Sequence, residues 1–211
     1  MSGLAMQAGQ SSRSASGAGH QFSHVWEMEG HGLDWEPPLS HGFKVGVGTV
    51  ASCAIWEEFL KLDAEDFDVD HALAAVKSPE QVESEVRAAL IPRMQEEAVR
   101  HSLKKRTEGD ELVARIELLK KKWPELREKL RAQLLAPEDI MDRLKTVGAP
   151  YHPELIEIDW DRFRQTHFKA QMIRDRYTVF DILVDLGIYG TVVDKLFAPE
   201  GFWGRHRHPS E

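Results

Sequence analysis

Apolar side chains recur at helical spacing over most of the chain after residue 78. Residues 78–81 read Ser-Pro-Glu-Gln, which is a typical helix start, with the serine as N-cap and proline at the first helical position. An apolar stripe with a period of 3.6 residues follows, and Pro92 breaks or kinks that helix. Further helices are predicted over residues 112–135 (with Pro124 as a point of division), 137–148, 159–177, 178–186 and 191–197.

The amino-terminal part of the chain is less regular. Residues 20–28 fit one short helix, and a loop rich in glycine and proline follows over residues 30–38. Residues 43–62 are nearly all apolar and include several small residues, which predicts a buried helix packed tightly against its neighbours; periodicity alone leaves open a strand over residues 45–50. Elsewhere only residues 155–158 have the pattern of a strand. The predicted fold class is therefore all-α.

Composition is that of an ordinary globular protein of one or at most two domains. The chain has 211 residues, of which 42% are hydrophobic and 29% charged. Its net charge of −8 argues against nucleic-acid binding, and no apolar run reaches the roughly 18 residues of a membrane span. The single cysteine, Cys53, rules out an internal disulfide and favours a reducing compartment, so a cytoplasmic location is expected.

One helical domain over residues 1–211 is predicted, with its helical core at residues 20–197 and a carboxyl-terminal tail at 198–211. Residues 1–19 are rich in glycine, serine and alanine and form either a disordered leader or a loop at a cleft. Charge is uneven, because residues 101–135 carry ten basic and six acidic side chains. This basic stretch is either a solvated helix face or a site for a phosphate or another subunit.

Three histidines form the candidate chemistry. His20 and His24 are four residues apart and share one face of a helix, and His41 follows a loop that could fold back toward them. Imidazole is a common ligand for divalent metals, and two histidines from adjacent helices with one carboxylate can make a catalytic site. The alternative from spacing alone is a pair of capped or partly exposed histidines.

The surrounding sequence resembles a known family. The strings SSRSASGAGHQFSHVWEM at residues 11–28 and SHGFKVGVGT at 40–49 resemble the metal-binding segment of the sn-glycerol-1-phosphate dehydrogenases. These enzymes belong to the glycerol dehydrogenase and iron-containing alcohol dehydrogenase superfamily, with the dehydroquinate synthase-like fold. GAPYHP at residues 148–153, IRDRYT at 173–178 and DLG at 185–187 are similar to the carboxyl-terminal region of that family. The resemblance runs from residue 1 to about residue 197.

The resemblance implies an all-helical carboxyl-terminal domain that follows a Rossmann-like domain, with the active site in the cleft between them. His20 and His41 match the two metal-ligating histidines, and His24 matches a non-ligating histidine that could relay a proton. The implied reaction is reversible hydride transfer between NAD or NADP and a small phosphate substrate, dihydroxyacetone phosphate. The implied metal is divalent, zinc before nickel or iron. Three further residues match the loop beside the cofactor and substrate: Arg13, Ser16 and Gly17.

Two parts of the family pattern have no counterpart in this sequence. No residue matches the aspartate that is the third metal ligand, and no Gly-rich pyrophosphate turn follows a strand. The chain is therefore expected to be the metal-binding half of the enzyme, inactive alone, and to associate with a nucleotide-binding half or another subunit as an oligomer. The alternatives are a glycerol or other polyol dehydrogenase, and a non-catalytic helical interaction module or truncated remnant.

Overall fold

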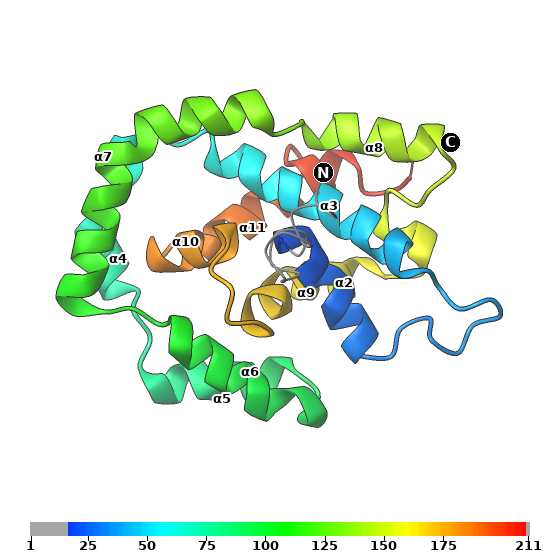
Figure 1. Ribbon diagram of the computed structural model, residues 1–211, viewed down its shortest axis with the longest axis horizontal. Coiled ribbons are helices and arrows are strands. Elements are labelled where there is room, and N and C mark those ends of the chain that lie inside the picture. The colour runs from blue at the N-terminus through cyan, green and yellow to red at the C-terminus, as the bar shows by residue number, and fades with distance from the viewer. Residues whose placement is uncertain (1–16, 210–211) are drawn as a thin grey trace, which may run out of the picture.

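Helices make up the regular structure of residues 17–209, which are the residues that the computed structural model describes (Figure 1). This part of the chain contains no strand, so the all-α prediction is confirmed. Two short 3-10 helices, η2 (Ala64–Asp66) and η3 (Pro153–Ile156), join the others. The α-helices are α2 (Ala18–Met28), α3 (His41–Phe59), α4 (Val69–Ala74), α5 (Pro79–Ala89), α6 (Pro92–Lys105), α7 (Gly109–Gln133), α8 (Pro137–Thr146), α9 (Trp160–Met172), α10 (Val179–Asp185), α11 (Tyr189–Phe197) and α12 (Phe202–Arg205).

Local capping chemistry sets several helix boundaries as predicted. At the start of α5, the Ser78 hydroxyl accepts a hydrogen bond from the Gln81 amide at 3.2 Å, and the Gln81 side chain accepts one from the Ser78 amide at 2.8 Å. The Asp159 carboxylate caps α9 by accepting from the Arg162 amide at 2.8 Å. Gly187 follows α10 with a φ of 70°, a left-handed conformation that glycine adopts without strain.

The structure corrects three expectations about secondary structure. The strand left open over residues 45–50 is excluded, because these residues lie within α3. The strand over residues 155–158 is wrong: the first two of these residues belong to η3, which ends at Ile156, and Glu157 follows in a left-handed conformation. The apolar side chains of Ile156 and Ile158 enter the core instead of pairing with another strand. Pro124 does not divide α7, which continues through it and bends along its length (Figure 1).

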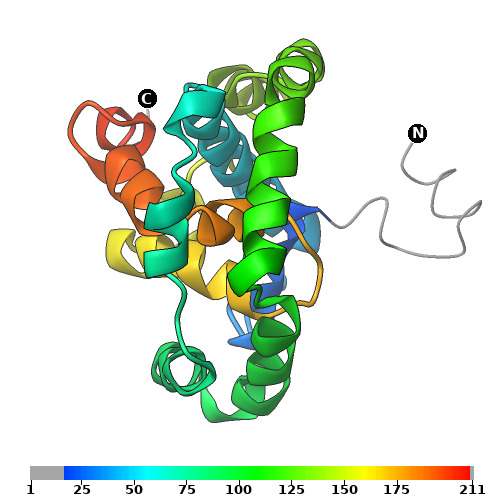
Figure 2. The ribbon, with the colours of Figure 1, turned by 90° about the vertical axis from the view of Figure 1, so that its left-hand side faces the viewer.

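The core lies between α2, α3, α9, α10 and α11. Its large side chains are fully buried aromatic rings from distant parts of the chain, including Phe22, Trp26, Phe163 and Phe180. The Trp26 indole donates a hydrogen bond to the Thr166 hydroxyl at 3.0 Å, which ties α2 to α9. Figures 1 and 2 show α5 and α6 side by side at the lower end of the molecule, with α7 leading away from them along one edge.

A close approach between α2 and α3 positions the histidines. A Cβ atom on Gly48 would lie 2.3 Å from the carbonyl oxygen of Gly19 and 2.9 Å from Cβ of Phe22. Any side chain here would force the two helices apart, so only glycine fits the observed crossing. The tight helix packing that small residues predicted for this stretch is therefore confirmed.

The boundaries of the helical core extend beyond residues 20–197. At the amino-terminal side, α2 begins at Ala18. At the other end, the segment at residues 198–211 contains α12, whose Phe202 and Trp203 are buried. The His206 carbonyl also bonds the buried His152 ring at 2.8 Å. The segment has too few residues to show a helical period, and its two aromatic side chains place it in the core.

No helix in the described part of the chain combines the length and the apolar character that a bilayer crossing requires.

Candidate functional site

Three imidazole rings meet where α2 lies beside the start of α3. His20 and His24 project from the same face of α2, and His41 is the first residue of α3. The ring centroids are 5.7 Å apart for His20 and His41, 6.2 Å for His20 and His24, and 6.0 Å for His24 and His41. The two histidines that the sequence singles out as metal ligands therefore converge, with the third beside them.

A carboxylate that the sequence analysis did not single out joins this cluster. The Glu27 carboxylate lies 2.6 Å from Nδ1 of His41 and 3.5 Å from Nδ1 of His24. The ammonium of Lys44, whose side chain is only 1% exposed, lies 3.5 Å from the same carboxylate. Helical spacing carried the available signal: Glu27 is three residues after His24 and seven after His20, so it shares their face of α2.

The electrostatic environment lowers the pKa of the Glu27 carboxyl and of two of the imidazoles, His20 and His24. Partial burial would raise the pKa of Glu27, but hydrogen bonds and charge from His41 and Lys44 outweigh it and lower that pKa below its ordinary value. The pKa of His20 is lowered by burial, then by His41 and Arg176. Burial and the positive charge of Arg174 lower the pKa of His24. Neutral imidazole is the form that binds a metal, so the cluster has the chemistry of a ligand set.

The spacing of His20 and His41 fits one shared metal ion. An imidazole bound at roughly 2.0–2.1 Å places its ring centroid about 3 Å from the ion, so two such rings lie about 5–6 Å apart. The 5.7 Å separation of His20 and His41 is within this range. Because Glu27 holds Nδ1 of His41, Nε2 is left for a metal. Within residues 17–209, however, no group of three or more His, Cys, Asp or Glu side chains is arranged to hold an ion.

The loop expected beside the cofactor is only partly described. Arg13 and Ser16 lie outside the described residues. Gly17 precedes α2, and a Cβ atom placed on it would meet nothing within 4 Å. Two residues further on, a Cβ on Gly19 would lie 3.0 Å from the Thr49 backbone, so this end of α2 is held closely against α3.

A buried amide without hydrogen-bond partners lies next to His20 in sequence. Gln21 is buried, and neither its amide nitrogen nor its carbonyl oxygen has a partner among residues 17–209. A buried polar group left unpaired costs about 1–3 kcal/mol of stability. Such groups need an explanation in a native structure.

Curated relatives match part of this chain. Over 79 residues it is 39% identical to "Glycerol-1-phosphate dehydrogenase [NAD(P)+]" of Methanococcus maripaludis strain C5, and 38% identical to the protein of the same name from strain C6. Each match covers 37% of this chain and 24% of the relative, so the chain spans about a quarter of the length of the curated relatives it matches. No family model and no solved structure matches the chain. The resemblance found in the sequence is thus confirmed: over part of its length, this chain is similar to glycerol-1-phosphate dehydrogenases.

Proposed function

We propose that this chain is the metal-binding helical part of an NAD(P)-dependent glycerol-1-phosphate dehydrogenase. The observation that carries the proposal is the convergence of the His20 and His41 rings at 5.7 Å, on two helices that cross at Gly48. The partial sequence match supports the reaction class. In this proposal the chain acts with a nucleotide-binding part or another subunit, which binds NAD or NADP and supplies the third metal ligand.

The residues of the cluster have distinct roles in this reaction. A bound divalent metal, zinc before nickel or iron, would stabilise the charge that builds on the ketone oxygen when hydride is added. His20 and His41 would hold the metal, and Glu27 fixes the orientation of His41. His24 lies beside both rings and can carry the proton that the reduced oxygen needs.

Arginines on the α9–α10 connection suit a phosphate substrate. Arg174 and Arg176 lie close enough to the cluster for their charges to lower the pKa of His24 and His20. Both come from the string at residues 173–178 that carries the family resemblance. A phosphate group on a small substrate bound at the histidines would be attracted to this positive side of the site.

Metal titration tests the ligand assignment directly. Calorimetry of the full chain with Zn²⁺ should detect one weak site, because two protein ligands leave the coordination sphere incomplete. His20→Ala and His41→Ala should each weaken binding by at least about tenfold, and Glu27→Gln by about tenfold, as outer partners of metal ligands do. His208→Ala is the matched control, because His208 is exposed and pairs with Glu154. Unchanged affinity in both ligand variants would rule out this site and favour a non-catalytic helical module.

Turnover tests the role in the dehydrogenase. The purified 211-residue chain should oxidise NADH or NADPH very slowly with dihydroxyacetone phosphate and Zn²⁺, because residues 17–209 hold neither a three-ligand centre nor a strand-based dinucleotide fold. Adding the nucleotide-binding part of a relative should raise the rate, and His41→Ala should prevent this gain. Rapid oxidation by the chain alone would contradict the expected division of the site.

A further inference from the structure

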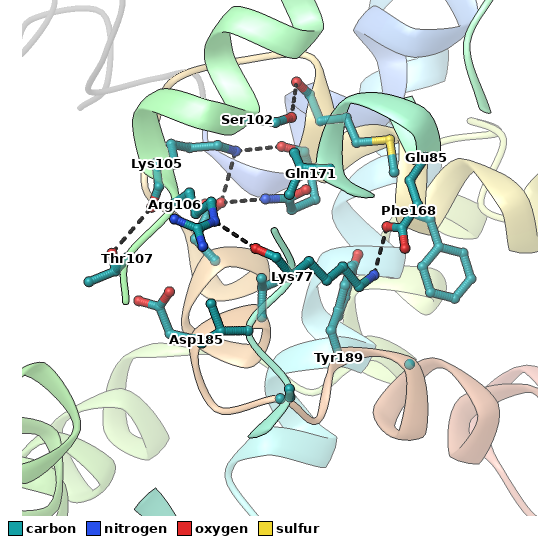
Figure 3. Close-up of a pocket in the computed structure, with 18 of the residues that line it drawn as sticks. Lys77, Glu85, Ser102, Lys105, Arg106, Thr107, Phe168, Gln171, Asp185 and Tyr189 are labelled. Carbon is teal, nitrogen blue, oxygen red and sulfur yellow. Dashed lines mark hydrogen bonds and ion pairs between the residues drawn. The ribbon is translucent and has the colours of Figure 1, made fainter. Parts of the chain in front are cut away.

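A cavity of about 300 Å³ lies outside the histidine cluster, among residues of α5, α6, α9, α10 and the starts of α7 and α11 (Figure 3). None of the residues that line it comes from α2 or α3. This volume is at the lower end of the range for small-molecule pockets. Part of its lining is apolar and includes Val82, Val86, Leu112, Phe168 and Met172.

Two neighbouring cations on the cavity wall retain hydrogen-bond donors. The Lys105 side chain is 5% exposed, and among the described residues its ammonium has two partners: the Asp181 carboxylate at 2.8 Å and the carbonyl of Gln171. An ammonium carries three donors and a guanidinium five. Arg106 uses Nε toward the Lys77 carbonyl at 2.6 Å and Nη2 toward Glu108 at 2.7 Å. Donors therefore remain on both residues.

The most buried carboxylate of the same cavity, Asp181, is fully engaged. Asp181 accepts hydrogen bonds from the Gln171 amide at 2.9 Å and from the Thr178 amide and hydroxyl at 2.7 and 3.1 Å, besides its contact with Lys105. These four partners match the roughly four acceptor positions of a carboxylate.

The other two carboxylates have partners of their own. Asp185 accepts from the Tyr177 hydroxyl at 2.6 Å and from Arg115 at 2.8 Å. Glu85 pairs with Lys77 at 2.6 Å, as Figure 3 shows. Each carboxylate of the cavity thus has a partner within the protein, and the donors that remain on Lys105 and Arg106 can bind an anionic head group.

We propose that this cavity is a second binding site, for a small organic anion with an apolar body. Its carboxylate or equivalent head group would bind at Lys105 and Arg106, and its body would contact the apolar wall formed by side chains such as Val82 and Phe168. The site is independent of the metal and of the proposed dehydrogenase reaction. It gives a structural reason for part of the basic stretch at residues 101–135.

Octanoate is a suitable probe of this chemistry. In a ¹H–¹⁵N NMR titration of the full chain, octanoate should produce saturable shifts centred on the backbone amides of Gly187 and Gly190, both at the cavity. Its affinity should exceed that of octan-1-ol, which lacks the charge, and that of inorganic phosphate, which lacks the apolar body, each by about tenfold or more. Equal affinities for octanoate and octan-1-ol, or no shifts at the cavity, would overturn the proposal.

Two variants separate the head-group site from the apolar wall. A Cβ atom on Gly190 meets nothing within 4 Å, so Gly190→Leu should fold normally and obstruct the cavity, lowering octanoate affinity at least about tenfold. Thr191→Leu is the matched control, because Thr191 is exposed and does not line the cavity. Arg106→Gln should weaken octanoate binding and leave octan-1-ol binding unchanged. Octanoate binding that survives Gly190→Leu and Arg106→Gln at full strength would place the anion elsewhere.

Discussion

Replacing Lys105 with methionine is expected to lower the free energy of unfolding by about 3–5 kcal/mol, whereas Lys104→Met should change it by less than about 0.5 kcal/mol. Both lysines pair with an aspartate, at 2.6 Å for Lys104 with Asp175 and 2.8 Å for Lys105 with Asp181. The pairs differ in exposure, 67% and 27% for the first and 5% and 3% for the second. Without its lysine, the buried Asp181 carboxylate loses its balancing charge. Urea unfolding of the two variants measures the difference.

The double variant Lys105→Met with Asp181→Asn is the internal check on this explanation. Removing both charges should recover a large part of the lost stability, because the cost comes from one uncompensated charge and not from the lost contact. If the double variant is as unstable as the sum of its single variants, the loss is due to packing around α10. Equal losses in Lys104→Met and Lys105→Met would contradict the role assigned to burial.

Acidification from pH 7 to pH 4 is expected to destabilise the folded chain by about 3 kcal/mol through His167 alone. This ring is fully buried among Phe22, Phe163 and Phe197, and its Nδ1 donates to the Phe163 carbonyl at 3.0 Å. Burial lowers its pKa to about 4, from about 6.5 when exposed. Between these values the unfolded chain binds a proton that the folded chain does not, so stability falls as pH falls through this window.

His167→Phe isolates this contribution. The variant keeps an aromatic ring in an aromatic environment and removes both the titrating group and the buried Nε2, which has no partner in the described part of the chain. Urea unfolding at several pH values should give a shallower pH dependence for the variant than for the parent, with the difference confined to pH 4–6.5. Parallel curves would show that His167 already titrates normally in the folded state.

Features that depend on a few neighbouring residues could be predicted from the sequence. The cap at Ser78, the helix break at Pro92 and the stop at Gly187 are local, and each lies where expected. The role of Trp203 could not be predicted, because it depends on packing against Phe163, a ring forty residues away. A short apolar run also failed to separate a strand from η3, since so few residues do not define a period.

The candidate site was also predictable only in part. His20 and His41 could be found from spacing and resemblance, and their rings converge. Glu27 was missed because its partner His41 lies on another helix, and only the approach of α2 to α3 brings them together. The second cavity was beyond prediction, since its walls come from six helices and the loops between them. The basic stretch gave only a hint, because sequence does not reveal which of two adjacent lysines is buried.

The crossing of α2 and α3 has a consequence for the order of folding. All three histidines and Glu27 lie within one helical hairpin, residues 18–59, closed by the short loop between Met28 and His41. Closing a short loop costs little entropy, and local helical contacts form early. The imidazoles can therefore meet before α9 arrives to bond Trp26 through Thr166. A metal present at that stage would act as a folding ligand, stabilising the hairpin while the chain is still being synthesised.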